Sequence, residues 1–339
     1  MMKKIKTQDL KKLNIFLSGK CNLRCKHCFL GNSIYRRSSL SLKQVENVLR
    51  FFRKRDYSSV EFSGGEPTLS PILFQSISLA RALKYEEIGI STNGTNPAVI
   101  NQLDPKQVTR FTFSLDGATE KTNDFIRGQG HFTTCVKSIK KSVKSGFTTH
   151  VIFTANKINF HEFEKAAREL DHIGVDRLSV NYTSFTGNAK KHPELILSPQ
   201  EWLEINEKAK KIKGLKHIAL RYPIRFSKEK ARKQDILRKY PCLLQHPNRV
   251  YVFSNGAIYY CCLLTDEQNL NSGFVTEKGV VMKHSGNERS LLKTMPRALC
   301  PAQELSNRKV GPPSLPDGIK PICIYHRIVV FQGKSHPSN

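Results

Sequence analysis

The sequence has few acidic residues and no long apolar run. It contains 28 Asp and Glu residues against 55 Lys and Arg residues, so the formal net charge is +27. No stretch is apolar for long enough to cross a bilayer as a helix. Residues 1–12 are basic but lack the apolar segment of a secretory signal. These absences predict a soluble, cytosolic protein.

The shortage of acidic residues has two interpretations. A strongly basic protein attracts anionic partners such as nucleic acid, an acidic peptide or a phosphorylated small molecule. However, the sequence lacks a basic motif interleaved with aromatic residues, and its Lys and Arg residues are spread along predicted helices. We favour a solvated basic surface. An RNA-binding module with a structural metal cluster is the alternative from another functional class.

The nine cysteines have an odd count and no accompanying secretory signal, which argues for metal or redox chemistry rather than disulfides. Cys21, Cys25 and Cys28 have C-x3-C-x2-C spacing and follow the apolar run 13–18. Thiolates are natural ligands of an iron–sulfur cluster, and three ligands leave one iron of a four-iron cube open. A zinc site would need a fourth ligand from elsewhere in the chain. Three buried cysteines on one helix face are the structural alternative.

Short β-like runs alternate with helical patterns, which predicts an α/β fold with a parallel sheet. The predicted strands are 13–18, 59–62, 87–91, 110–114, 149–155 and 177–182, and the helical patterns are 42–52, 72–83, 96–103, 131–145, 160–173 and a segment opening at 198. Capping boxes are expected at Ser41 and Ser198, and Asn159 is expected to cap a helix. After about residue 225 the pattern breaks. There, Ser254-Asn255-Gly256 predicts a hairpin between 250–253 and 257–262.

Polar or glycine-rich motifs follow four of the predicted strands. They are the cysteine loop, the Gly64-Gly65-Glu66 stretch, Asn93 and Ser114. In barrels built from parallel strands, chemistry gathers at the carboxyl ends of the strands. We therefore expect these residues to meet at one rim.

These motifs resemble those of radical S-adenosylmethionine (radical SAM) enzymes. After the three cysteines come S-G-G-E-P at 63–67, S-T-N-G at 91–94, S-L-D-G at 114–117 and R-G-Q-G at 127–130, in the family's order. The basic residues at the start of the sequence form a predicted arm at 1–11. The resemblance implies a partial (β/α)6 barrel over 12–225 and a [4Fe–4S] cluster on the three cysteines that binds SAM. It also implies a 5′-deoxyadenosyl radical that takes a substrate hydrogen, with a reductant such as flavodoxin or ferredoxin.

The resemblance also assigns residues to SAM. Gly64 and Gly65 would receive its amino group while Glu66 structures their loop. Asn93 and Ser114 would meet the ribose and methionine ends. The guanidinium group of Arg127 would bind the carboxylate of SAM through two parallel hydrogen bonds. His27 stands where the family often has an aromatic residue near the adenine of SAM.

The C-terminal cysteines resemble the SPASM and twitch domains of this family. Cys242, thirteen residues, Gly256, four residues and Cys261 match their opening, but the central C-x2-C-x5-C-x3-C is missing. The resemblance thus implies a twitch-like domain over 226–339. Its single auxiliary [4Fe–4S] cluster would lie on Cys242, Cys261, Cys300 and Cys323. A zinc ion on the same four thiolates is the alternative.

Cys262 is adjacent to a predicted cluster ligand, and neighbours on a strand point to opposite faces. The resemblance to radical SAM epimerases suggests Cys262 as the hydrogen-atom donor, with a small buried hydrophobe as the alternative. Cys135 is expected to pack in the core. The predicted activity is epimerisation of a ribosomally made (RiPP) precursor peptide or a small metabolite. Dehydrogenation or cross-linking of a peptide, through a thioether or C–C bond, is the rival within the family.

Overall fold

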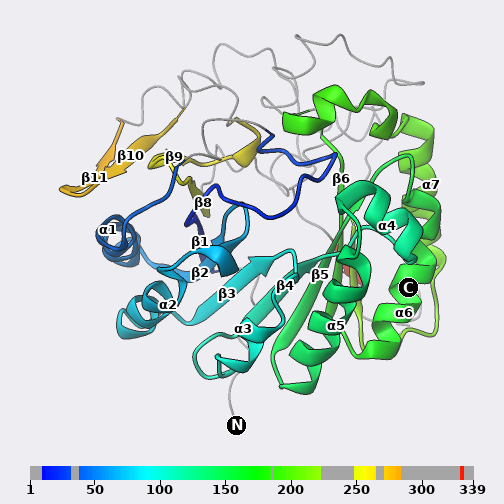
Figure 1. Ribbon diagram of the computed structural model, residues 1–339, viewed down its shortest axis with the longest axis horizontal. Coiled ribbons are helices and arrows are strands. Elements are labelled where there is room, and N and C mark those ends of the chain that lie inside the picture. The colour runs from blue at the N-terminus through cyan, green and yellow to red at the C-terminus, as the bar shows by residue number, and fades with distance from the viewer. Residues whose placement is uncertain are drawn as a thin grey trace, which may run out of the picture.

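The structure is a computed structural model that describes residues 10–31, 38–184, 186–222, 248–264, 271–283 and 329–331. Figure 1 shows a curved sheet with helices along its outer side. The described strands form one sheet in the order β11-β10-β9-β8-β1-β2-β3-β4-β5-β6-β7-β12. Neighbours from β8 to β7 are parallel. The predicted α/β fold with a parallel sheet is therefore confirmed, and its curvature is consistent with a partial barrel.

The six predicted βα units are present, with one further helix and one further strand. The parallel strands are β1 (Lys11–Phe16), β2 (Tyr57–Ser63), β3 (Glu87–Thr92), β4 (Arg110–Ser114), β5 (Thr148–Ala155), β6 (Arg177–Tyr182), β7 (Ala219–Tyr222) and β8 (Arg249–Val252). The helices are α1 (Leu42–Arg53), α2 (Leu73–Ala82), α3 (Ala98–Asn101), α4 (Glu120–Arg127), α5 (His131–Lys144), α6 (Phe163–Ile173) and α7 (Pro199–Lys211). The sequence patterns missed α4 and β7.

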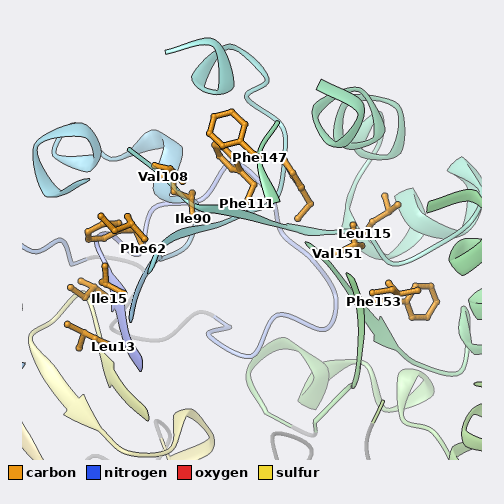
Figure 2. Packing of buried hydrophobic residues seen from close by; sticks show 14 of the residues in the cluster. Leu13, Ile15, Phe62, Ile90, Val108, Phe111, Leu115, Phe147, Val151 and Phe153 are labelled. Carbon is orange, nitrogen blue, oxygen red and sulfur yellow. The ribbon is translucent and has the colours of Figure 1, made fainter. Parts of the chain in front are cut away.

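The core lies between the sheet and its helices. Alternate strand residues such as Leu13, Ile15 and Phe62 are fully buried, and Figure 2 shows the same core continuing along the sheet to Phe111 of β4 and Val151 of β5. Since side chains alternate across a strand, the residues between them face the other side of the sheet. That inner side carries most of the polar residues described below.

Two of the three expected helix caps are confirmed. Ser41 and Ser198 each form a capping box, with Gln44 and Glu201 respectively. The prediction for Asn159 is wrong, because α6 begins at Phe163 after the short 3-10 helix η3 (Phe160–Glu162) and Asn159 makes no side-chain cap. The Asn159 amide instead donates to the backbone carbonyl oxygens of Asp116 and Thr154.

The predicted hairpin after β8 is present, but its second strand is shorter than expected. β9 (Ala257–Tyr259) pairs antiparallel with β8 and ends before the cysteines, so Cys262 begins the 3-10 helix η6 (Cys262–Leu264). The sheet also gains three unpredicted strands, β10 (Gly273–Thr276), β11 (Gly279–Met282) and β12 (Val329–Phe331). Because β8 pairs with β1, the hairpin extends the sheet of the predicted barrel. The domain division after residue 225 stays a prediction.

The remaining short helices are η2 (Pro67–Leu69), η4 (Gly187–Lys191) and η5 (Pro193–Leu195). Among the helices that the structure describes, none is both long and apolar enough to cross a membrane.

The carboxylate of Asp171 in α6 fixes the entry to β7, where it accepts hydrogen bonds from the backbone N–H groups of Lys216, His217 and Ile218 at 2.7–3.0 Å. Replacing it by Asn should lower the free energy of unfolding by about 1–3 kcal/mol, because the three backbone donors, of which that of Ile218 is buried, lose a charged acceptor. Urea titration measures the loss. Asp56→Asn, at an exposed carboxylate, is the control and should be nearly neutral.

The loss of unfolding free energy caused by Asp171→Asn should depend on pH. Burial acts to raise the pKa of Asp171, but the three backbone donors hold it below its ordinary value. Its stabilising contribution is therefore present above about pH 4, the ordinary value for Asp, and is lost as the pH falls through the lowered pKa. The difference between wild type and Asp171→Asn should shrink below that pH; a constant difference would contradict this account.

Candidate active site

The loop that follows β1 carries Cys21, Cys25 and Cys28. All three are partly exposed and none is in a disulfide. In the described part of the chain, no three Cys, His, Asp or Glu side chains converge as ligands of one metal ion. Each cysteine of a cubane cluster binds a different iron, so such a cluster does not need three sulfurs that converge on one point. Three thiolate donors on one partly exposed loop fit such a cluster.

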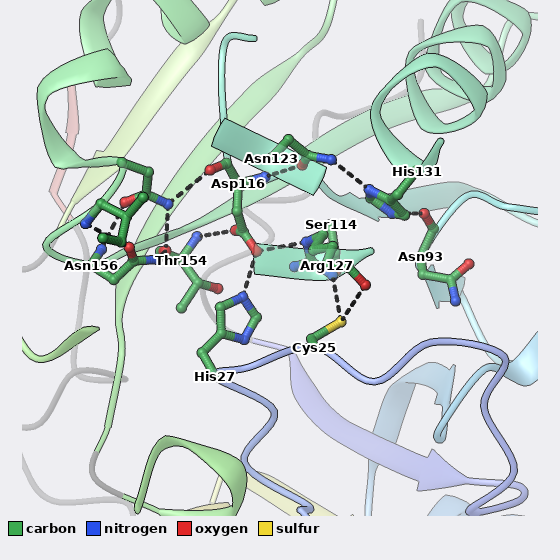
Figure 3. Close-up of polar contacts among 12 residues, drawn as sticks. Cys25, His27, Asn93, Ser114, Asp116, Asn123, Arg127, His131, Thr154 and Asn156 are labelled. Atoms are coloured by element: carbon green, nitrogen blue, oxygen red, sulfur yellow. Dashed lines mark hydrogen bonds and ion pairs between the residues drawn. The ribbon is translucent and has the colours of Figure 1, made fainter. Parts of the chain in front are cut away.

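The carboxylate of Asp116, just beyond β4, holds the cysteine loop (Figure 3). It lies 2.5 Å from His27 Nε2 and 2.6 Å from Arg127 Nε, and it accepts a hydrogen bond from the Thr154 N–H at 2.6 Å. Asp116 is fully buried. Burial acts to raise the pKa of Asp116, but the Arg127 charge and the His27 contact hold it well below the ordinary value. The carboxylate is therefore ionised and anchors both partners.

Arg127 ends α4 and touches the central cysteine. Its Nη1 lies 3.9 Å from the Cys25 sulfur, and its carbonyl oxygen lies 3.9 Å from the same sulfur. Its contact with Asp116 is an ion pair rather than an aligned hydrogen bond. The binding of the SAM carboxylate by Arg127 stays a prediction. Within the chain, the guanidinium group of Arg127 already has the Asp116 carboxylate as a partner. Burial raises the pKa of the Cys25 thiol to about 11, and a bound iron would deprotonate it.

Glu66 organises the turn after β2, as the sequence suggested. It is fully buried and accepts hydrogen bonds from the Thr68 and Thr92 hydroxyls and from the Asn93 N–H, all at 2.7 Å. Asn93 in turn donates to Asn22 Oδ1 at 2.9 Å and lies 3.9 Å from the Cys21 sulfur. The end of β3 is thus connected to the cysteine loop.

Gly64 and Gly65 let the backbone of the β2 turn pack directly on the cysteine loop. The Gly65 N–H donates to the Ser18 carbonyl at 2.7 Å, and a Cβ on either glycine would collide with carbonyl oxygens of residues 18–20. Ser114 lies at the end of β4, half-buried, with its carbonyl 3.6 Å from the sulfur of Cys135. Cys135 is fully buried in the core, which confirms its expected packing role.

The segment after β6 also holds the cysteine loop, which sequence reasoning missed. The Asn188 backbone N–H donates to the Cys28 carbonyl at 2.8 Å, and its side-chain amide donates to the Cys25 carbonyl at 2.9 Å. Gly187, with φ +56°, packs against Cys28 so closely that a Cβ would collide with carbonyl oxygens of the loop. The glycine followed by asparagine was the only local signal of this contact.

Cys261 and Cys262 are buried in a second apolar cluster with Phe16 and Phe253, and Cys28 packs against that cluster. The two C-terminal cysteines therefore lie close to the cysteine loop. The premise that both cysteines lie on a strand is wrong, because β9 ends at Tyr259 and Cys262 begins η6. The expectation that their thiols point apart stays a prediction. The other predicted ligands, Cys242, Cys300 and Cys323, lie outside the described residues.

Comparison with known proteins agrees with this geometry. Residues 15–170 match the model of the family described as the radical SAM superfamily. This part of the chain belongs to the radical SAM superfamily. Membership implies a [4Fe–4S] cluster and SAM, and Cys21, Cys25 and Cys28 are the residues that fit the cluster.

Relatives of this radical SAM domain include the mycofactocin maturase MftC of Mycobacterium ulcerans, which is 32% identical over 158 residues. That match covers 46% of this chain and 42% of MftC. Human molybdenum cofactor biosynthesis protein 1 is 25% identical over 191 residues, covering 54% of this chain and 30% of that protein. The chain thus spans less than half of the length of these curated relatives.

Solved structures share the fold. Streptococcus suis SuiB bound to S-adenosylmethionine has a TM-score of 0.61 at 19% identity, covering 77% of this chain and 62% of SuiB. The structure of anSMEcpe with bound AdoMet and the Kp18Cys peptide has a TM-score of 0.56 at 16% identity, covering 82% and 79%. At these identities the likeness shows the fold alone.

Replacing Gly187 by Ala should displace the cysteine loop of the radical SAM domain. The positive φ costs roughly 1–3 kcal/mol for any residue with a Cβ, and the collision with the loop is an additional effect. The matched control is Gly214→Ala, which has φ +79° but nothing within 4 Å of the new Cβ. Both variants should lose stability, but only Gly187→Ala should bind less iron on anaerobic reconstitution. Equal iron contents would contradict the predicted contact.

Removing the Asp116 carboxylate should leave a buried, unpaired Arg127 charge. We expect Asp116→Asn to cost about 3–5 kcal/mol of unfolding free energy, the range for breaking one side of a buried ion pair. In a double-mutant cycle, adding Arg127→Gln should cost much less than the sum of the single changes. The exposed pair of Glu164 and Arg168 is the control and should couple by less than about 1 kcal/mol. Additive losses for Asp116 and Arg127 would contradict direct pairing.

Proposed function

We propose that this chain is a radical SAM enzyme that epimerises a residue of a ribosomally made peptide, with Cys262 as the hydrogen-atom donor. The observation that carries the proposal is the packing of Cys28, a predicted ligand of the SAM cluster, against the apolar cluster that contains Cys262. A thiol beside the radical-forming loop is suitably placed to meet a substrate radical formed there. The peptide class is supported by relatives and structures named as a maturase and as complexes with peptides.

The chemistry supplied by a bound cluster and SAM is homolytic cleavage of SAM and abstraction of a hydrogen atom from a substrate carbon. The residues of the chain position these groups. Asp116 fixes Arg127 and His27. The Asn188 amide holds the loop from the segment after β6, and the Glu66 N–H, which donates to the Lys20 carbonyl, holds it from the turn after β2. The predicted contacts of Gly64, Gly65, Asn93 and Ser114 with SAM belong to this proposal.

Cys262 would complete the inversion. Its S–H bond breaks and gives a hydrogen atom to the planar carbon radical from the face opposite the abstraction. The thiyl radical that remains takes up one electron, from a reductant such as flavodoxin or ferredoxin, and one proton from solvent.

The auxiliary [4Fe–4S] cluster on Cys242, Cys261, Cys300 and Cys323 is part of the same proposal. Cys261 is the one of these ligands that the structure describes. A variant with Ala at Cys21, Cys25 and Cys28 should keep about four irons on the auxiliary site, the content of one cube. Zinc in place of iron would favour the structural zinc alternative.

The rival activity is dehydrogenation or cross-linking of the peptide. Epimerisation leaves the product mass unchanged, whereas the rival removes two hydrogens. A basic RNA-binding module remains the alternative from another class, and it predicts no cleavage of SAM.

The test uses the reconstituted full chain, SAM, a reductant and a candidate precursor peptide encoded beside the gene. In deuterium oxide the product should differ from the substrate in mass only by one deuterium that replaces hydrogen at the inverted carbon, because the Cys262 thiol exchanges with solvent. Cys262→Ala should still produce 5′-deoxyadenosine but lose the inverted product. Cys135→Ala, at a buried thiol of the core, is the control and should retain inversion.

Three outcomes would contradict the proposal at different levels. Inversion at the wild-type rate by Cys262→Ala would remove Cys262 as donor. A product two hydrogens lighter would replace epimerisation by the rival. Undiminished 5′-deoxyadenosine from the variant with Ala at Cys21, Cys25 and Cys28 would overturn the assignment of the cluster ligands.

A further inference from the structure

The inner face of the sheet carries a belt of charged side chains far from the cysteine loop. The loop follows the carboxyl end of β1, whereas Glu87, Arg110, Arg177 and Arg249 are the first residues of their strands and lie at the amino ends. The belt residues, from β1 to β8, are Lys12, Glu61, Glu87, Arg110, Arg177, Arg221 and Arg249. These comprise five cations and two carboxylates, so the belt has an excess of positive charge.

Both carboxylates of the belt are already used. Arg110 contacts Glu61 at 2.5 Å and Glu87 at 3.1 Å, and Lys12 contacts Glu61 at 2.7 Å. Ser91 donates to the other oxygen of Glu61 at 2.7 Å. The pairs on β1–β4 therefore neutralise one another. Among the described residues the cations on β6 and β7 have no ion pair of their own, although the charges of Glu87 and Asp176 act on Arg177 from beyond ion-pair distance.

Three cations of the belt are left over. Arg249 of β8 has the side chain of Tyr251 beside it, and the other two are Arg177 of β6 and Arg221 of β7. Arg221 is directly paired with Ser179 in the register of the two strands, so Arg177, two positions earlier, is its diagonal neighbour on the same face. Within the described residues neither arginine has an ion pair, and the Nε of each is buried without a hydrogen-bond partner. Burial and the nearby charges of Arg221 and Arg110 lower the pKa of Arg177 to about 10.

Two adjacent guanidinium groups with buried, unused donors are costly unless an anion accompanies them. We propose that Arg177 and Arg221 bind one oxyanion group, a phosphate or a carboxylate, on the inner face of the sheet at the amino ends of β6 and β7. Planar guanidinium forks match the oxygen geometry of both groups. The site is separate from the cysteine loop and does not depend on radical chemistry.

The test measures thermal unfolding of the full-length protein with inorganic phosphate, with acetate, and with sodium chloride at matched ionic strength. Phosphate should raise the melting temperature saturably, as a ligand of the folded state does, and chloride should not. Arg177→Gln and Arg221→Gln should each weaken the apparent affinity for phosphate at least about tenfold, since each removes a charged donor. Arg81→Gln, which removes the same charge at an exposed position, is the control and should bind phosphate normally.

The variants also test the unpaired charge itself. Without phosphate, Arg177→Gln should be at least as stable as wild type, because it removes an uncompensated charge, and with phosphate the order should reverse. A response to acetate as well would assign the site to carboxylates in addition to phosphates. A rise that chloride reproduces, or one that both Gln variants retain in full, would overturn the proposal. Calorimetric titration of wild type with phosphate provides a second measurement that does not depend on the variants, and absence of binding there would also overturn it.

Discussion

The position of the cysteine loop depends on one buried carboxylate. Asp116 is removed from water, so its charge has to be compensated within the protein. Arg127 supplies the compensation from the end of α4, and His27 supplies a contact from inside the loop, between two of the cysteines. The N–H of Thr154 ties the same carboxylate to β5. One side chain thus connects the loop, a helix and the sheet, which sets where the sulfur of Cys25 lies relative to Arg127.

Backbone contacts fix the cysteine loop from two segments, the turn after β2 and the segment after β6. The β2 turn packs against residues 18–20 through Gly64 and Gly65, and the segment after β6 packs against Cys28 through Gly187 and Asn188. Since these contacts involve carbonyl oxygens, they restrain the path of the loop rather than its side chains. The cysteine side chains remain partly exposed at the rim while the chain that carries them is held in place. A site that must receive a cluster needs this combination of rigid support and access.

The sequence predicted features that arise from local patterns and missed those that depend on distant partners. Strands β1 to β6 and both capping boxes were predictable, because short β-favouring runs and Ser-x-x-Gln/Glu spacing are patterns of a few consecutive residues. The Asn188 amide reaches Cys25 across 163 positions of the chain, and the preceding Gly187 indicates a tight turn but not which distant segment packs against it. Asn159 was misassigned for the same reason, since its amide bonds Asp116 across 43 positions instead of capping a helix. Strand β7 has only four residues, too few for a clear alternation.

Cys262 does not lie on a strand as expected, and its actual position shows how the cysteine loop meets the segment after β9. Alternation failed because β9 stops at Tyr259, yet the turn of η6 brings Cys262 into an apolar cluster with Phe16 and Phe253, whose rings stack at 4.4 Å. Cys28 packs against that cluster, so the loop is held by polar contacts at Cys25 and His27 and by apolar packing at Cys28. Apolar packing is tight and transmits changes of volume. A change of side-chain size at Cys262 therefore bears on the position of Cys28 as well, which is why a Cys262 variant has to be judged by SAM cleavage and by inversion together.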